Sequence, residues 1–197
     1  ALSSPTCLAV SSTDTAPALI ALGATVSLVS SEGSRQIPIG DLYRNDGMHY
    51  LTRRPDEILT TVQVPDLSGW RSAYWKLRRR GSFDFPVLGV AAALQLERNG
   101  TVTQARIVLG AVSSRPLLAE KAAASLLGRP LSDETIAGAA DLAFVISKPM
   151  DNTDFPLVWR KRVTRDFVTY ALRELRGDDM RAMRTRIARH ALQGLSS

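Results

Sequence analysis

The sequence predicts an α+β fold in which short strands come first and a run of helices closes the chain. Segments with apolar–polar alternation, typical of half-buried strands, are concentrated between residues 25 and 110. Helical periodicity dominates after residue 116, and only one short helix is expected before the strands. Because strands and helices are segregated rather than alternating, a doubly wound parallel sheet is not expected.

The first expected unit, residues 1–69, contains one short helix and three short strands. The helix covers residues 14–22, with Asp14 as its N-cap and Gly23 as its C-terminal stop. The expected strands are residues 25–29, 36–39 and 58–64.

The second expected unit, residues 70–177, is a small antiparallel sheet packed with three helices. The turn at Asn99-Gly100 predicts a β-hairpin, because this dipeptide favours the left-handed backbone that tight hairpin turns need. The expected strands are residues 70–77, 87–96 and 102–110. The expected helices are residues 117–127, 132–147 and 156–176. A basic helical tail, residues 178–197, follows.

Composition limits the class of protein and its compartment. Apolar residues make up 45% of the chain and charged residues 22%, which excludes wholesale disorder. No apolar run approaches the ~18 residues needed to cross a bilayer, so we expect no transmembrane segment. The single cysteine, Cys7, excludes an intramolecular disulfide and suits a reducing compartment, so we expect a cytoplasmic protein.

The positive charge of the chain is concentrated near its C-terminus. The net charge is +6, and residues 160–189 hold ten Lys/Arg against four Asp/Glu. Nucleic-acid modules interleave aromatic residues with such cations, whereas only Phe167 and Tyr170 occur here, on the apolar face. We therefore expect no nucleic-acid partner. A solvated surface or one that docks an acidic partner is favoured, and membrane association of the tail lacks a bulky aromatic anchor.

The residues alone indicate no catalytic chemistry. The sequence contains no zinc-spaced Cys/His set, no P-loop and no G-x-G-x-x-G motif. Three stretches nevertheless match one family in order and spacing. They are Asp14 to Val26, Gly33 to Tyr43 with Pro55 to Leu59, and Tyr74-x-Lys76-x3-Arg80-x3-Asp84-Phe85. Together they resemble the FAD subunits of molybdenum hydroxylases, the flavoprotein family of xanthine dehydrogenase and carbon monoxide dehydrogenase.

The resemblance implies both a fold and a function. Residues 1–69 would be the rear half of the FAD-binding α+β domain, and residues 70–177 the carbon monoxide dehydrogenase flavoprotein C-terminal domain. The family's N-terminal half and its glycine-rich pyrophosphate loops have no counterpart in this sequence. The subunit would pass electrons between FAD and iron–sulfur clusters. It would work in a hetero-oligomer with a molybdopterin-binding large subunit, which carries the molybdenum cofactor, and a 2Fe-2S small subunit.

The resemblance also implies cofactor-binding residues, each with a simpler alternative. Asp14 matches an acidic FAD contact, although a helix N-cap explains it equally well. Ile58 and Leu59 match apolar residues beside the isoalloxazine ring, but ordinary strand packing also accounts for them. Lys76 matches a lysine near the flavin, and the alternative is a solvated member of a basic cluster. Arg80 and Asp84, four residues apart, are also compatible with a surface ion pair.

Within the family, two stretches look most like the β subunit of 4-hydroxybenzoyl-CoA reductase. They are Cys7 to Val10 and Asp151 to Asp154. That branch carries an additional 4Fe-4S cluster, and Cys7 would be its last ligand; the alternative is a small apolar thiol. The other cysteines are absent, so this chain alone cannot hold such a cluster. The competing hypothesis is a flavin-free interaction module that docks partner subunits.

Overall fold

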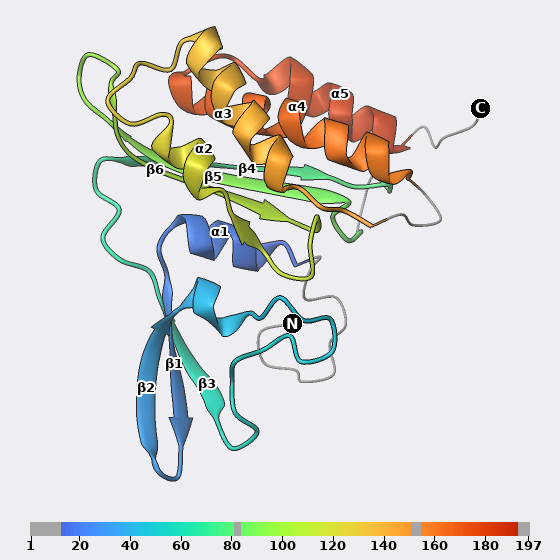
Figure 1. Ribbon diagram of the computed structural model, residues 1–197. Coiled ribbons are helices and arrows are strands. Elements are labelled where there is room, and N and C mark those ends of the chain that lie inside the picture. The colour runs from blue at the N-terminus through green and yellow to red at the C-terminus, as the bar shows by residue number, and fades with distance from the viewer. Residues whose placement is uncertain (1–12, 81–83, 151–154, 193–197) are drawn as a thin grey trace.

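The computed structural model describes residues 13–80, 84–150 and 155–192. It confirms the α+β class: a three-stranded sheet and a four-stranded sheet are both antiparallel, and most helices follow the strands in the chain. Figure 1 shows the smaller sheet below the larger one, with helix α1 (Thr15–Ala21) between them.

The smaller sheet has the strand order β2-β1-β3. Its strands are β1 (Thr25–Ser30), β2 (Gly33–Pro38) and β3 (Ile58–Gln63), all close to the expected ranges. A short 3-10 helix, η2 (Ile39–Leu42), follows β2. The buried core of this unit comes from α1, β1, η2 and the following loop, and comprises Ala16, Ala24, Val26, Leu28, Ile39, Leu42, Tyr43 and Tyr50.

The larger sheet has the strand order β4-β5-β6-β7. Its strands are β4 (Trp70–Leu77), β5 (Leu88–Leu96), β6 (Val102–Gly110) and β7 (Leu117–Leu118). Strands β5 and β6 form the predicted hairpin, and Gly100 in its turn has a φ of 84°. Asn99 Oδ1 accepts a hydrogen bond from the Thr101 amide at 2.9 Å, which closes the turn.

Four helices follow the strands and lie together on one face of the larger sheet (Figure 1). They are α2 (Glu120–Ala124), α3 (Asp133–Ile146), α4 (Leu157–Arg176) and α5 (Arg181–Leu192). The expected N-cap of α3 is confirmed, because Ser132 Oγ accepts from the Thr135 amide at 3.1 Å. Burial of Phe167, Val168 and Leu172 of α4 against Leu94 and Ile107 of the sheet forms the main core.

Helix α1 covers the opposite face of the same sheet. Its Ala21 is buried with Ala91, Ala93 and Val108 of β5 and β6. The helix is held at its C-terminal end by Arg106, whose Nη1 donates to the Ala21 carbonyl at 3.2 Å. Small side chains on the sheet therefore let α1 approach closely, and the larger sheet is the middle of three layers.

Two expectations for local structure are wrong. Residues 117–127 were expected to be one helix, but Leu117 and Leu118 pair with β6 and the helix starts only at Glu120. The open edge of β6 offers backbone partners there, and a sheet edge competes with the helix for the same amides. Asp14 does not cap α1 through its side chain, because it lies in the α-region and its carboxylate binds partners far along the chain.

The basic C-terminal stretch is only partly a solvated surface. Arg160 is buried, and its Nη2 donates to the carbonyls of Val87 and Ala111 at 3.1 and 2.8 Å. Arg176 pairs with Asp178 at 2.6 Å and lies at the end of α4. Several arginines of this stretch thus pair with nearby carboxylates or bind backbone carbonyls of loops. In the described part of the chain, no helix combines the length and hydropathy required to span a bilayer.

Candidate functional site

A cluster of three polar side chains joins α1 to β4. Tyr74 Oη donates to Asp14 Oδ1 at 2.9 Å, and Lys76 Nζ donates to Asp14 Oδ2 at 2.7 Å. Residues i and i+2 of a strand point to the same face, so Tyr74 and Lys76 both reach the N-terminal end of α1. Two of the residues that sequence reasoning assigned to the cofactor, Asp14 and Lys76, are therefore brought together.

Gly89 makes this arrangement possible. It lies opposite Lys76 in the β4–β5 pairing, and a Cβ atom at this position would lie 2.8 Å from the hydroxyl oxygen of Tyr74. Any side chain on Gly89 would therefore displace the phenol that holds Asp14. The hydroxyl is largely withdrawn from water, and this burial, with the nearby Asp14 carboxylate, raises the pKa of Tyr74, so that it stays a hydrogen-bond donor.

Lys76 is not a solvated member of a basic cluster, which was the alternative to a role beside the flavin. Its side chain is 19% exposed, and Nζ also donates to the backbone carbonyl of Asp84 at 2.6 Å. Asp84 is itself fixed: its carboxylate accepts from the Arg80 guanidinium at 3.1 Å and from the Arg80 amide at 2.9 Å. These contacts lower the pKa of Asp84 to about 2, so the carboxylate stays ionised. The Arg80–Asp84 pair thus fixes the residue whose backbone carbonyl holds Lys76.

A hollow of about 410 Å³ opens beside this cluster. Strand β4 and helix α5 form most of its wall, and its lining residues are Asp14, Tyr74, Trp75, Lys76, Arg78, Arg184, Ile187 and Ala188. Arg184 holds α5 in place: its guanidinium lies 4.2 Å from the Trp75 ring centroid and pairs with Glu174 at 2.5 Å. The tail helix is therefore part of the site.

Sequence reasoning assigned no site role to Tyr74, Gly89 or Arg184, although Tyr74 begins the motif that contains Lys76. The signal for Tyr74 was available, because it stands two residues before Lys76 in an expected strand and so shares its face. No local signal identifies Arg184, which lies on a separate helix 110 residues after Tyr74, to whose carbonyl it donates.

Ile58 and Leu59 lie elsewhere, at the start of β3, and neither lines the hollow beside Lys76. Alternation along the strand places them on opposite faces of the small sheet. Leu59 packs against the core of the first unit, whereas the Ile58 side chain is exposed at 69%. Only one of the two can therefore contact any given ligand surface.

The proposed metal ligand lies beyond the part of the chain that can be described. Cys7 falls outside the described residues. Among residues 13–80, 84–150 and 155–192, no group of three or more His, Cys, Asp or Glu side chains is arranged to hold a metal ion.

Comparisons with known proteins place the chain in a family. Residues 72–175 match the model of the CO dehydrogenase flavoprotein C-terminal domain. The chain belongs to the CO dehydrogenase flavoprotein family. Residues 6–67 match a second model, the FAD binding domain in molybdopterin dehydrogenase. The Asp14–Lys76 contact therefore joins the segments that match the two models.

Relatives and solved structures agree with this assignment. The chain is 27% identical to the glyceraldehyde dehydrogenase medium chain of Sulfolobus acidocaldarius, over 80% of this chain and 54% of that one. It is 31% identical to the aldehyde oxidoreductase FAD-binding subunit PaoB of Escherichia coli, over 81% of this chain and 48% of that one. The chain thus spans about half the length of these relatives.

A solved structure of carbon monoxide dehydrogenase from Hydrogenophaga pseudoflava superposes with a TM-score of 0.76 and 28% identity. The match covers 82% of this chain and 55% of that one. None of the relatives named here is a reductase of an aromatic CoA thioester.

Proposed function

We propose that this chain is part of the FAD-carrying electron-transfer subunit of a molybdenum hydroxylase-like oxidoreductase, and that the hollow beside Lys76 receives part of the FAD. One observation carries the proposal. Asp14 and Lys76 are 62 residues apart and lie in the segments that match the two flavoprotein models, yet they meet at 2.7 Å at the edge of a hollow.

The residues present fit a flavin in donor chemistry and in size. An ammonium group has three donors, and Lys76 uses two of them on Asp14 and Asp84, which leaves one for a ligand. The hollow has the volume of a small-molecule site, for which about 300–1,000 Å³ is usual. Ile58 is an exposed apolar side chain that could lie against a planar ring, and Leu59 would act through packing beneath it.

The roles of the chain's own residues follow from charge and position. FAD supplies the redox chemistry when bound. Lys76 places a positive charge beside the ligand, which favours the form with more electrons because opposite charges attract more strongly where water is partly excluded. Asp14 and Tyr74 hold that charge in position, and the remaining acceptor capacity of Asp14 can accept a ligand hydroxyl.

The partners and substrate belong to the same proposal. We infer that a molybdopterin-binding large subunit and a 2Fe-2S small subunit complete the oxidoreductase. The relatives' names as medium chains, FAD-binding subunits and subunits of a complex support this inference. A finer possibility, a 4-hydroxybenzoyl-CoA reductase-like complex with a 4Fe-4S cluster at Cys7, is supported by the motifs at Cys7 to Val10 and Asp151 to Asp154 alone.

The test is FAD binding, measured through the visible absorbance of the flavin after gel filtration. The proteins are this chain and a longer form that includes any residues that precede Ala1 in the natural subunit. We expect Lys76→Ala to weaken FAD binding about tenfold or more, because a hydrogen bond to a charged group contributes about 1.5–3 kcal/mol. The matched control is Lys121→Ala, which removes an exposed lysine from α2 and should leave FAD binding unchanged.

Two results would contradict the proposal. If the longer form binds no FAD, the chain is a flavin-free interaction module. If it binds FAD but Lys76→Ala and Lys121→Ala behave alike, the flavin lies elsewhere. If FAD binds as proposed, its reduction by an added iron–sulfur partner measures electron transfer directly.

A further inference from the structure

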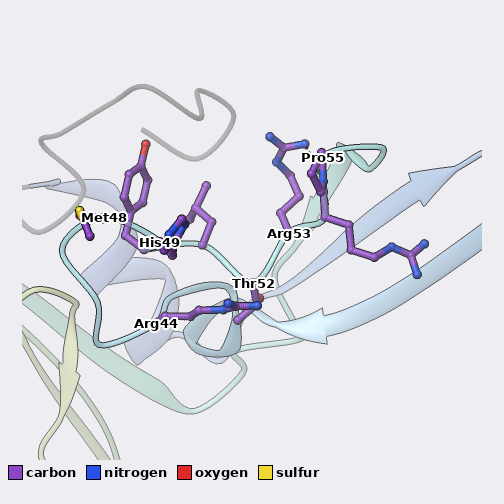
Figure 2. Close-up of a pocket in the computed structure, with 9 residues that line it drawn as sticks. Arg44, Met48, His49, Thr52, Arg53 and Pro55 are labelled. Atoms are coloured by element: carbon purple, nitrogen blue, oxygen red, sulfur yellow. Dashed lines mark hydrogen bonds between the residues drawn. The ribbon is translucent and has the colours of Figure 1, made fainter.

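A second hollow, of about 480 Å³, lies in the loop between η2 and β3 (Figure 2). Its lining residues are Arg44, Met48, His49, Tyr50, Leu51, Thr52, Arg53, Arg54 and Pro55. None of them lines the hollow beside Lys76, and none is an aspartate or glutamate. Figure 2 shows His49 and Arg53 on opposite sides of the hollow, with Arg44 reaching toward Thr52.

The backbone of this loop is held in shape by its own hydrogen bonds. The Arg44 amide donates to the Tyr50 carbonyl at 2.9 Å, which closes the loop at its base. Asp46 Oδ1 accepts from the amides of Met48 and His49 at 2.8 and 3.0 Å, which fixes the turn at the tip. These two bonds, together with the nearby charges of His49 and Arg44, lower the pKa of Asp46, so its carboxylate stays ionised. The hollow is therefore largely formed before any ligand arrives.

Among the described residues, two of the three guanidinium groups at this hollow form no close ion pair with a carboxylate. Arg54 pairs with Asp56 at 3.4 Å and with Glu57 at 3.5 Å. Arg44 and Arg53 form no ion pair with any residue that the structure describes. Arg53 Nη1 donates only to the backbone carbonyls of Arg54 and Glu57, and its buried Nε has no acceptor among the described residues. Within the described part of the chain, Arg53 therefore has no carboxylate partner, and Arg44 feels the Asp46 charge only from beyond ion-pair distance.

We propose that this hollow binds a phosphate-bearing organic anion, with Arg44, Arg53 and His49 around the phosphate. Two guanidinium groups that form no close ion pair within the described residues can bind a phosphate monoester, which carries about −1.5 to −2 charge at pH 7. Guanidinium groups also suit the bidentate geometry of phosphate oxygens. The volume exceeds what a phosphate group fills, and Met48 and Pro55 offer an apolar wall for the organic part of the ligand.

The test is isothermal titration of the chain with ADP, inorganic pyrophosphate and inorganic phosphate. We expect saturable binding of ADP that weakens at high salt and is tighter than binding of pyrophosphate, because the organic part contributes. Arg44→Ala should weaken ADP binding about tenfold or more. Arg98→Ala is the matched control: it removes an exposed arginine from the β5–β6 turn and should leave binding unchanged.

Three outcomes would overturn the proposal. The first is that none of the three anions binds saturably. The second is that Arg44→Ala and Arg98→Ala weaken ADP binding equally, which would indicate unspecific attraction to a basic chain. The third is that FAD displaces ADP in competition, because the arginines would then hold the flavin's own pyrophosphate rather than a separate ligand. Binding of ADP alongside FAD supports a site distinct from that of the flavin.

Discussion

Tyr74 and Gly89 together set the position of Asp14, and their coupling can be measured. Gly89→Ala should destabilise the protein by about 1–3 kcal/mol, because its Cβ would overlap the Tyr74 hydroxyl oxygen at 2.8 Å. In the Tyr74→Phe background the cost should be clearly smaller, since the nearest remaining ring atoms lie at 3.4 Å. Urea unfolding of the wild type, both single variants and the double variant gives the coupling energy. Purely additive effects would show that the hydroxyl does not fill this space.

Glu57 makes stability depend on pH at the start of β3. Its buried carboxylate binds the Arg35 guanidinium at 2.6 and 2.9 Å, which, with the Arg54 amide, lowers its pKa from 4.5 to about 2. The folded pKa lies below the unfolded one, so the contribution is complete above pH 4.5 and is lost as pH falls toward 2. Glu57→Gln should cost about 2 kcal/mol at pH 7.

Free energies of unfolding measured between pH 7 and pH 2 test this expectation. The difference between the wild type and Glu57→Gln should shrink as pH falls below 4.5. Glu32→Gln is the control, because the exposed Glu32 side chain forms no ion pair in the described part of the chain. A difference that stays constant down to pH 2 would assign the loss to packing rather than to charge.

At the scale of elements, the docking of α1 on the large sheet depends on Gly110. A Cβ atom at Gly110 would lie 2.8 Å from Cγ of Pro17, so Gly110→Ala should push the helix away and cost about 1–3 kcal/mol. Gly138→Ala is the matched control: it lies in α3 with nothing within 4 Å and should stabilise by about 0.5–1 kcal/mol. Thermal unfolding should therefore shift in opposite directions for one chemical change. If Gly110→Ala also raised the unfolding temperature, α1 would be able to move away from the sheet at no cost in stability.

The elements that sequence could predict are those determined by local chemistry. The β5–β6 hairpin follows from the backbone preferences of Asn99-Gly100, and the start of α3 from the Ser132 cap. The sequence around Leu117 does not reveal that it pairs with Leu109, because the edge of β6 exists only in the folded sheet. Leu117 was therefore expected to lie in a helix. Asp14 was assigned to a helix cap for the same kind of reason, since its partners lie on β4.

Prediction of the site had the same limit at a larger scale. Asp14 and Lys76 were selected through a family resemblance, and the structure brings them together. The wall supplied by α5 was not foreseen, because its contact with Trp75 depends on how helices pack rather than on any motif around Arg184. The hollow lined by Arg44 and Arg53 was also missed, because its shape depends on hydrogen bonds that the Asp46 side chain accepts from the amides of Met48 and His49.

Across the whole molecule, α1 couples two cores that could otherwise unfold separately. Its Ala16 is buried in the core of the small sheet, and its Ala21 is buried against the large sheet. All three tryptophans, Trp70, Trp75 and Trp159, lie in β4 or α4, and Trp70 packs against the cluster that buries Ala21 of α1, so their fluorescence reports on the larger unit and on the α1 contact with it. Hydrogen exchange of the β1 amides reports on the smaller unit.

We therefore expect the two probes to give the same free energy of opening in the wild type, since neither core can expose its share of α1 while the other stays intact. In Gly110→Ala, the helix is displaced from the large sheet, so β1 should exchange at a lower free energy than the tryptophan transition reports. Gly138→Ala should keep the two values equal. Separate values already in the wild type would mean that α1 belongs energetically to one unit only, and the Asp14–Lys76 contact would then join two bodies that open independently.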